Sequence, residues 1–154
     1  MATATVTQSG VGSLSNVTQQ SADAGTFGVS ATVTQSDGAT SDVDQIASGA
    51  STDDITAVVD QAGASDSIIS QTFDEADGSA ISASVNQTGA GHQAMITQTD
   101  DPARGLNPDV DLTANITQTN ADNPATITQT NGDNLAEVRQ NGTLETATVT
   151  QSSR

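Results

Sequence analysis

The chain has 154 residues, of which 19 are Asp or Glu and only three are Lys or Arg, so its formal net charge is −16. Such a chain has no basic surface that could neutralise phosphates, and we expect no nucleic-acid partner. Because only 33% of the residues are hydrophobic and 1% are aromatic, the composition also excludes a globular core of large side chains.

A five-residue pattern recurs twelve times from one end of the chain to the other: Ala or Ser, any residue, Val or Ile, any residue, Gln. In chain order the copies occupy residues 4–8, 15–19, 31–35, 41–45, 57–61, 67–71, 83–87, 94–98, 114–118, 125–129, 136–140 and 147–151. Alternation with period two is typical of β-strands, so each copy is predicted to be a strand. Its Ala or Ser, its Val or Ile and its Gln then share the inward face.

The central position of the pattern supplies the predicted core. Its residues are Val6, Val17, Val33, Val43, Val59, Ile69, Val85, Ile96, Ile116, Ile127, Val138 and Val149. The odd-numbered strands often have a further inward apolar residue, at Val29, Ile55, Ile81 and Leu112. The even-numbered strands tend to have a polar residue there, at Ser13, Ser65, His92, Asn123 and Glu145. The two kinds of strand therefore alternate along the chain.

The spacing of the glutamines indicates how the strands are connected. Ten or eleven residues separate the two glutamines of a pair, and sixteen commonly separate one pair from the next. We therefore predict an all-β fold in one domain, residues 1–154: a β-solenoid with two strands per turn, about six turns and cross-β-like stacking. Short Gly-containing connections such as 9–12 and 88–91 are predicted turns. The longer, acidic connections 72–80 and 99–111 are predicted to be solvated arcs.

The inward glutamines need hydrogen-bond partners, because an amide buried without one is costly. Successive turns about 4.8 Å apart would let each amide bond to the next, giving a rod roughly 29 Å long. We expect structural ladders of Gln8, Gln19, Gln35, Gln45, Gln61, Gln71, Gln87, Gln98, Gln118, Gln129, Gln140 and Gln151.

Segment 87–98, from Gln87 through Gly89, His92 and Ala94 to Gln98, resembles the repeat of the curlins, Gln-x-Gly-x-x-Asn-x-Ala-x-x-x-Gln. Segments 118–129 and 129–140 keep the Asn and Ala of that repeat but have Asn120 and Asn131 in place of Gly. The chain departs from the family in its longer early arcs and in having almost no aromatic rings, so it is similar to a divergent curlin. Asn123 and Asn134 stand at the family's Asn position, and we count them among the ladder residues.

The resemblance implies a subunit of curli, the amyloid fibres of the bacterial surface. It implies export through an outer-membrane pore, growth from a nucleator subunit, and an extracellular role in the biofilm matrix and in adhesion. Met1 leads straight into the repeat, so we expect no signal peptide within this chain. No apolar run approaches the ~20 residues that cross a bilayer, and we expect no membrane span.

The sequence gives little support for catalysis or for a metal site. The chain has one histidine, His92, and no cysteine, and no nucleophile stands beside a plausible base, so we expect neither catalysis nor a cofactor. The acidic groups 53–54, 74–77 and 100–101 lack the spacing of known calcium loops, so we expect solvated arcs and no dedicated metal site, with weak calcium binding as the alternative. The alternative function is a soluble or cell-surface solenoid that binds a partner, such as an adhesin or an ice-binding module with outward Thr-x-Thr pairs.

The two ends of the repeat indicate self-assembly. The first and last copies both have the full pattern, and no capping segment is apparent beside them. Stable solitary solenoids need such caps. We therefore expect the chain to be its own partner, in a head-to-tail homopolymer.

Overall fold

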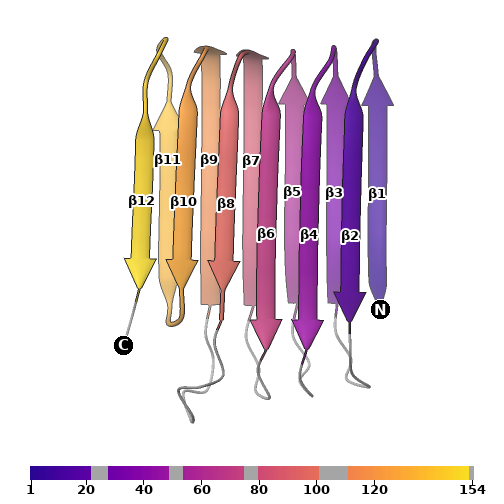
Figure 1. Ribbon diagram of the computed structural model, residues 1–154, viewed down its shortest axis with the longest axis vertical. Helices are drawn as coiled ribbons and strands as arrows, with labels where there is room; N and C mark the ends of the chain where they lie inside the picture. Colours follow the sequence, from indigo (N-terminus) through magenta and orange to yellow (C-terminus); the bar gives the residue numbers. More distant parts are fainter. Residues whose placement is uncertain (22–27, 49–53, 75–79, 101–110, 153–154) are drawn as a thin grey trace.

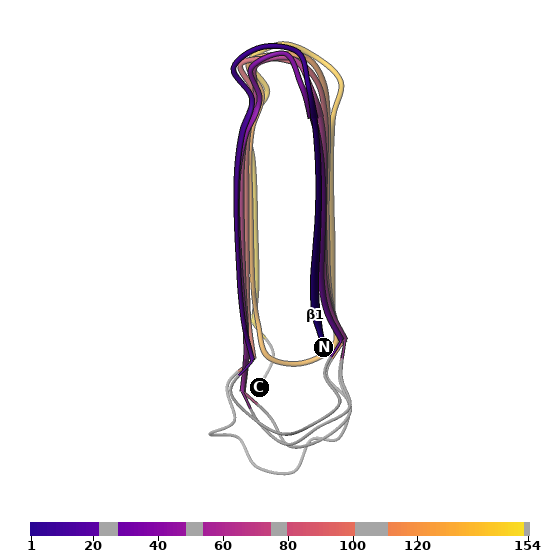
Figure 2. The same ribbon diagram turned by 90° about the vertical axis from the view of Figure 1, so that its right-hand side faces the viewer.

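The computed structural model describes residues 1–21, 28–48, 54–74, 80–100 and 111–152. These residues form twelve β-strands joined by turns, and no helix occurs among them. The strands lie in two sheets, seen as a front and a back row in Figure 1 and as the two long sides of a flattened loop in Figure 2. The predicted all-β solenoid is thus confirmed.

Each sheet has six strands. The first contains β1 (Ala2–Ser9), β3 (Gly28–Ser36), β5 (Asp54–Ala62), β7 (Ala80–Ala90), β9 (Asp111–Ala121) and β11 (Asn134–Gln140), in that order. The second contains β2 (Leu14–Ser21), β4 (Thr40–Ser48), β6 (Asp66–Asp74), β8 (Gln93–Thr99), β10 (Pro124–Thr130) and β12 (Ala147–Ser152). An odd strand and the even strand after it make one layer, so the first layer is β1–β2 and the last is β11–β12.

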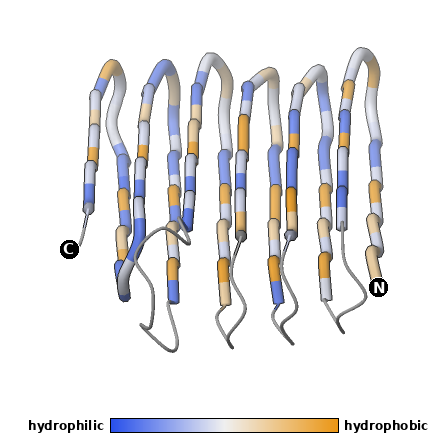
Figure 3. The backbone as a smooth tube through the Cα atoms, turned by 60° about the horizontal axis from the view of Figure 1, so that its bottom comes forward, coloured by the Kyte–Doolittle hydropathy of each residue, from blue (hydrophilic) through white to orange (hydrophobic). Residues whose placement is uncertain are grey.

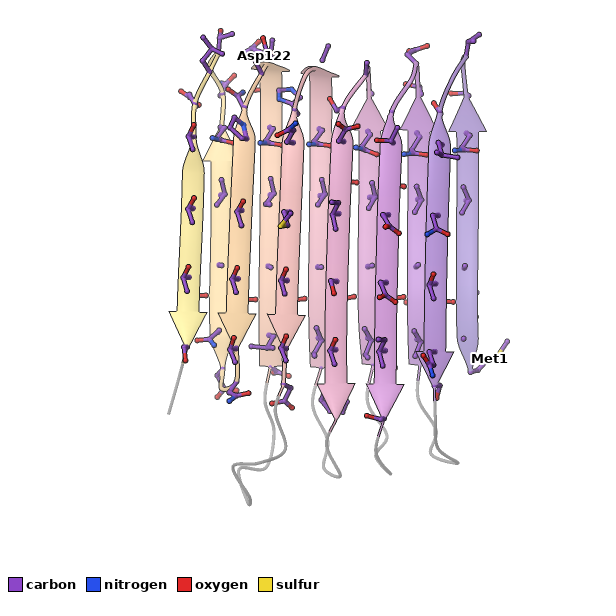
Figure 4. All side chains as sticks on the ribbon, in the orientation of Figure 1. Met1 and Asp122 are labelled. Carbon is purple, nitrogen blue, oxygen red and sulfur yellow. The ribbon has the colours of Figure 1, made fainter. Side chains whose placement is uncertain are left out.

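All neighbouring strands within a sheet are parallel and pair equivalent positions of the repeat. In β3 and β5, for example, Val33 lies beside Val59 and Gln35 beside Gln61. The same match continues through both sheets, and side chains of one kind therefore form columns along the stack (Figure 4). The columns explain why a chain with so few large side chains can fold: each small residue packs on its own equivalents.

The core lies between the sheets and is made of the Ala and the Val or Ile of each repeat. Nine of the twelve predicted core positions are buried: Val33, Val43, Val59, Ile69, Val85, Ile96, Ile116, Ile127 and Val138. The alternation of apolar and polar residues along the strands is visible in Figure 3. The exceptions are in the end layers, where Val17 and Val149 are half-buried and Val6 is 45% exposed. An end strand has a neighbour on one side only, so water reaches its inward face.

A second apolar cluster closes the interior at the arc side of the solenoid. It contains the predicted inward residues Val29, Ile55, Ile81 and Leu112, joined by Ala47 and Phe73. Strand β6 continues through Phe73, which is fully buried, so the prediction of a solvated arc from residue 72 is wrong at its start. Asp100, in the other predicted arc, is also buried. The remainder of these arcs, 75–79 and 101–110, lies outside the described residues.

Tight turns connect the sheets at the opposite side. Gly89 has a φ of 123°, and a Cβ on it would lie 1.9 Å from the carbonyl oxygen of Asn120 in the next layer. Only glycine fits such a close approach between backbones. On the arc side, the connection from β10 to β11 is shortened to residues 131–133, where Asn131 and Gly132 both have positive φ (Figure 1). In the part of the chain that the structure describes, no helix is long and apolar enough to span a membrane.

Candidate functional site: glutamine ladders and free strand edges

The glutamines of the first sheet form one continuous column of amide hydrogen bonds. In each pair the Nε2 of one glutamine donates to the Oε1 of the next. The bonds are Gln8 to Gln35 at 2.9 Å, Gln35 to Gln61 at 2.8 Å, Gln61 to Gln87 at 2.6 Å, Gln87 to Gln118 at 2.8 Å and Gln118 to Gln140 at 2.7 Å.

The second sheet has a matching column. Its bonds are Gln19 to Gln45, Gln45 to Gln71 and Gln71 to Gln98 at 2.9 Å, Gln98 to Gln129 at 2.8 Å, and Gln129 to Gln151 at 2.9 Å. The structure thus brings all twelve predicted glutamines into two ladders with the same donor direction, from the first layer toward the last. At the first layer each ladder begins with a side-chain oxygen, and at the last it ends with an amide nitrogen.

The second N–H of these amides crosses the interior to the backbone of the other sheet. In the second ladder the acceptors are the carbonyls of one column of the first sheet: Thr3, Ser30, Thr56, Ser82, Thr113 and Leu135, at 3.0–3.1 Å. In the first ladder Gln87 and Gln140 donate in the same way to Asp66 and Pro124, each at 3.2 Å. The amide burial is therefore offset by bonds along the stack and across it.

The orientation of the Gln35 amide follows from the ladder. Reversed, it would donate to the carbonyl of Leu14 at 3.3 Å and accept from the backbone N–H of Ser41. Reversal of this one residue would also set nitrogen against nitrogen at Gln8 and oxygen against oxygen at Gln61. These donor–donor and acceptor–acceptor contacts outweigh the gain of local partners. The common donor direction is therefore the consistent arrangement.

The two asparagines counted with the ladders lie outside the glutamine columns. Asn123, buried in the turn before β10, donates to the carbonyl of Gly142 at 2.9 Å and accepts from the N–H of Glu145 at 2.9 Å. It therefore joins two layers, but through backbone groups. Asn134, at the start of β11, donates to the carbonyl of Asn131 within its own turn.

His92 occupies the same turn position one layer earlier and is buried. Its Nε2 lies 3.2 Å from the carbonyl oxygen of Thr88, and its Nδ1 accepts from the N–H of Asn123 at 3.4 Å. Asn123 makes the equivalent contact with the carbonyl of Thr119 at 3.0 Å. Both ring nitrogens of His92 are thus engaged with backbone in a structural role between two layers.

Two acidic side chains near the arc side bond to the backbone of a neighbouring layer. Asp111 accepts from the N–H of Ala80, and Asp133 from the N–H of Asp111, both at 3.1 Å, so each carboxylate joins one layer to the next. Within the described ranges no group of three His, Asp or Glu side chains could hold a metal ion. Four members of the acidic groups considered for calcium, Asp53, Glu75, Asp77 and Asp101, lie outside those ranges.

Outward threonines stand beside one another on β1 and β3 of the first sheet and over a longer stretch in the later strands of the second sheet. Thr97, Thr128 and Thr150 are register neighbours on β8, β10 and β12. The same column continues to Ser70 and Asp44 toward the first layer, which ends the threonine array there.

The outer edges of the end layers have no partner strand among the described residues. Among the described strands, β1 pairs only with β3 and β2 only with β4, while β11 pairs only with β9 and β12 only with β10. One side of each end strand therefore presents backbone N–H and C=O groups to solvent, next to an open glutamine ladder. Comparison with known proteins found no family model, no curated protein and no solved structure that matches this chain.

Proposed function

We propose that the chain is a structural subunit that self-assembles end to end into extracellular, amyloid-like fibres. The observation that supports this proposal most directly is the pair of free edges at each end, each with an open glutamine ladder of complementary polarity. Because the two ends differ, contact between them is heterologous. Such a contact repeats without closing when copies stack along one axis, and it produces a filament.

The end strands lack the features by which sheet proteins protect their edges. Natural edge strands are blocked by proline, by inward-pointing charges or by bulges. No proline occurs in β1, β2, β11 or β12, and the residues on their inward faces are uncharged. The parallel, in-register stacking of identical side chains is also the arrangement of cross-β fibres.

The biological setting rests on the resemblance to curlins. It supports a fibre on the bacterial surface that contributes to the biofilm matrix and adhesion, with a nucleator subunit and an outer-membrane secretion pore as partners. The second candidate function is ligand binding by the outer face of the solenoid, for instance to ice. The threonine array on β8, β10 and β12 favours it, and thermal hysteresis of the purified chain tests it.

Electron microscopy and fibre diffraction of the purified chain test the main proposal. After incubation we expect unbranched fibres and a meridional reflection near 4.8 Å, the spacing of strands along the axis. The diffracting species should grow from the soluble chain after a lag that added fibre fragments remove. A chain that stays monomeric when seeded, at every concentration up to its solubility limit, would contradict the proposal.

A further inference from the structure

The large apolar side chains that reach solvent gather in the two end layers. In the first layer Val11 is 90% exposed and Leu14 is 67% exposed; in the last, Leu135 is 68% and Leu144 77% exposed. In the four layers between, the exposed large apolar residues of the described ranges are Val58, Ile68 and Met95, none more than 44% exposed. Leu14 and Leu135 stand at outward positions of their strands, whereas Val11 and Leu144 lie in the turns, where a layer stacked on either end would cover part of their apolar surface.

Acidic residues distinguish the two end layers from each other. Residues 1–21, which include the whole first layer, contain no Asp or Glu, although the chain has 19 acidic residues. The last layer contains Asp133, Glu137 and Glu145, and the second layer has acidic residues from Asp37 onward. A first layer placed on a last layer therefore keeps these two acidic groups about 10 Å apart, two strand spacings, close to the screening length in physiological salt.

The register predicts which strands meet. Continuing each column by one step places β1 of a second copy beside β11 and β2 beside β12. Gln8 then follows Gln140, and Gln19 follows Gln151, so the free oxygens at the start of one pair of ladders face the amide nitrogens that end the other. Among outward residues, Thr7 meets Arg139 and Thr18 meets Thr150.

The turns of the two end layers also match. Eleven residues separate the two glutamines in both layers, whereas ten separate them in the second and third layers. In the continued register Leu144 lies against Gly12, which has no side chain, and beside Val11. The turn of the first layer thus leaves space for the exposed leucine of the last.

We propose that two copies of this chain join in one register, with the uncharged β1–β2 layer of one copy on the β11–β12 layer of the other and Leu144 enclosed against Val11 and Gly12. The inference rests on the proposed function and specifies the partner surface. It adds that the first layer is the part of the chain adapted to receive an acidic end.

Cysteine pairs test the register, since the chain has no cysteine of its own. The variant with Thr7→Cys and Arg139→Cys places two thiols on directly opposed residues, about 4.8 Å apart at Cα, within disulfide range. The control with Thr5→Cys and Arg139→Cys offsets them by two residues, to about 8 Å, beyond that range. Thr18→Cys with Thr150→Cys repeats the test in the other sheet.

After mild oxidation of fibres and denaturation without reductant, both opposed pairs should give a ladder of covalent dimers, trimers and longer oligomers. The offset control should remain largely monomeric. Fibres in which opposed and offset pairs cross-link equally, or in which Thr7→Cys alone cross-links, would overturn the proposed junction and leave the fibre proposal intact. If the unmodified chain forms no fibres under any condition, both proposals fail.

Discussion

Gln129 donates to the backbone carbonyl of Thr113, 3.0 Å away on the opposite sheet, while it also donates to Gln151 in the next layer. One side chain thus bonds both along the stack and across the interior. Because the same arrangement recurs at β2, β4, β6 and β8, the ladders hold the two sheets together as well as the layers. Such a network replaces part of the apolar packing that this composition cannot supply.

The ladders should be a main source of stability. Changing Gln61→Leu together with Gln87→Leu leaves the Nε2 of Gln35 and the Oε1 of Gln118 without their buried partners. Each unsatisfied group costs about 1–3 kcal/mol. We expect urea denaturation of the soluble chain to show a free energy of unfolding that is lower by the sum of these two costs. We also expect fibres to grow more slowly.

The matched control for the ladder is Gln20→Leu, at an exposed position of β2 outside the ladders, which should alter stability much less. Equal unfolding midpoints for the double variant and the unmodified chain, with unchanged fibre diffraction, would argue against a stabilising role for the buried amides.

Phe73 should be the most sensitive single apolar residue. It is fully buried against Ala47, Val29 and their neighbours in the second cluster. Phe73→Ala removes an aromatic side chain from a packed interior, at a cost of about 3–5 kcal/mol. Ile68→Ala on the outer face of the same strand, where Ile68 is 44% exposed, is the control and should change the midpoint little. A similar midpoint shift for both variants would place Phe73 outside the core.

The period-two pattern was sufficient to predict the strands, the inward face and the solenoid, because a strand's two faces follow from alternation alone. Extending that alternation two residues past Gln45 and Gln71 would also have found Ala47 and Phe73. Acidic residues after Phe73 concealed this signal. The bond from Gln129 to Thr113 could not be predicted, since sequence gives no offset between opposed sheets. The exposure of Val6 depends on its place in the stack, which its repeat does not encode.

His92 should be replaceable by asparagine but not by alanine. Its contact with the carbonyl of Thr88 is equivalent to that of Asn123 with Thr119 one layer on. His92→Asn keeps a donor for that carbonyl and should shift stability by less than about 1 kcal/mol. His92→Ala leaves the Thr88 carbonyl and the Asn123 N–H without side-chain partners, at about 1–3 kcal/mol each. Thermal unfolding of both variants compares them, and equal loss in both would contradict the equivalence.

Salt should accelerate assembly. Copies with a net charge of −16 repel one another, and the repulsion is screened as the Debye length falls from about 10 Å at 0.1 M to about 3 Å at 1 M. We expect the lag before fibre growth to shorten steadily with sodium chloride. A variant with Asp42→Asn and Asp44→Asn, on the outer face of β4, should assemble faster at low salt and depend less on salt. A lag that is the same across this range would show that charge repulsion does not limit growth.

Growth by pairing of free edges can be blocked at one end. Successive residues of a strand direct their N–H groups to opposite neighbours, so of Thr148→Pro and Val149→Pro one removes a donor to β10 and the other a donor from the free edge of β12. The change that removes the donor to β10 should lower the free energy of unfolding of the soluble chain. The change that removes the donor from the free edge should leave the free energy of unfolding closer to that of the unmodified chain and still prevent extension beyond β12.

Combined as Thr148→Pro with Val149→Pro, the two changes leave the other eleven strands unaltered, so the first layer remains able to bind a growing fibre. A small proportion of this variant, added to the unmodified chain, should therefore occupy fibre ends and slow elongation out of proportion to its amount, as followed by seeded light scattering. An equal amount of a variant with both Thr5→Pro and Val6→Pro should likewise block the opposite end. If the double variant alone formed fibres at the normal rate, growth would have to proceed through lateral surfaces, because the backbone edge of β12 could not be extended.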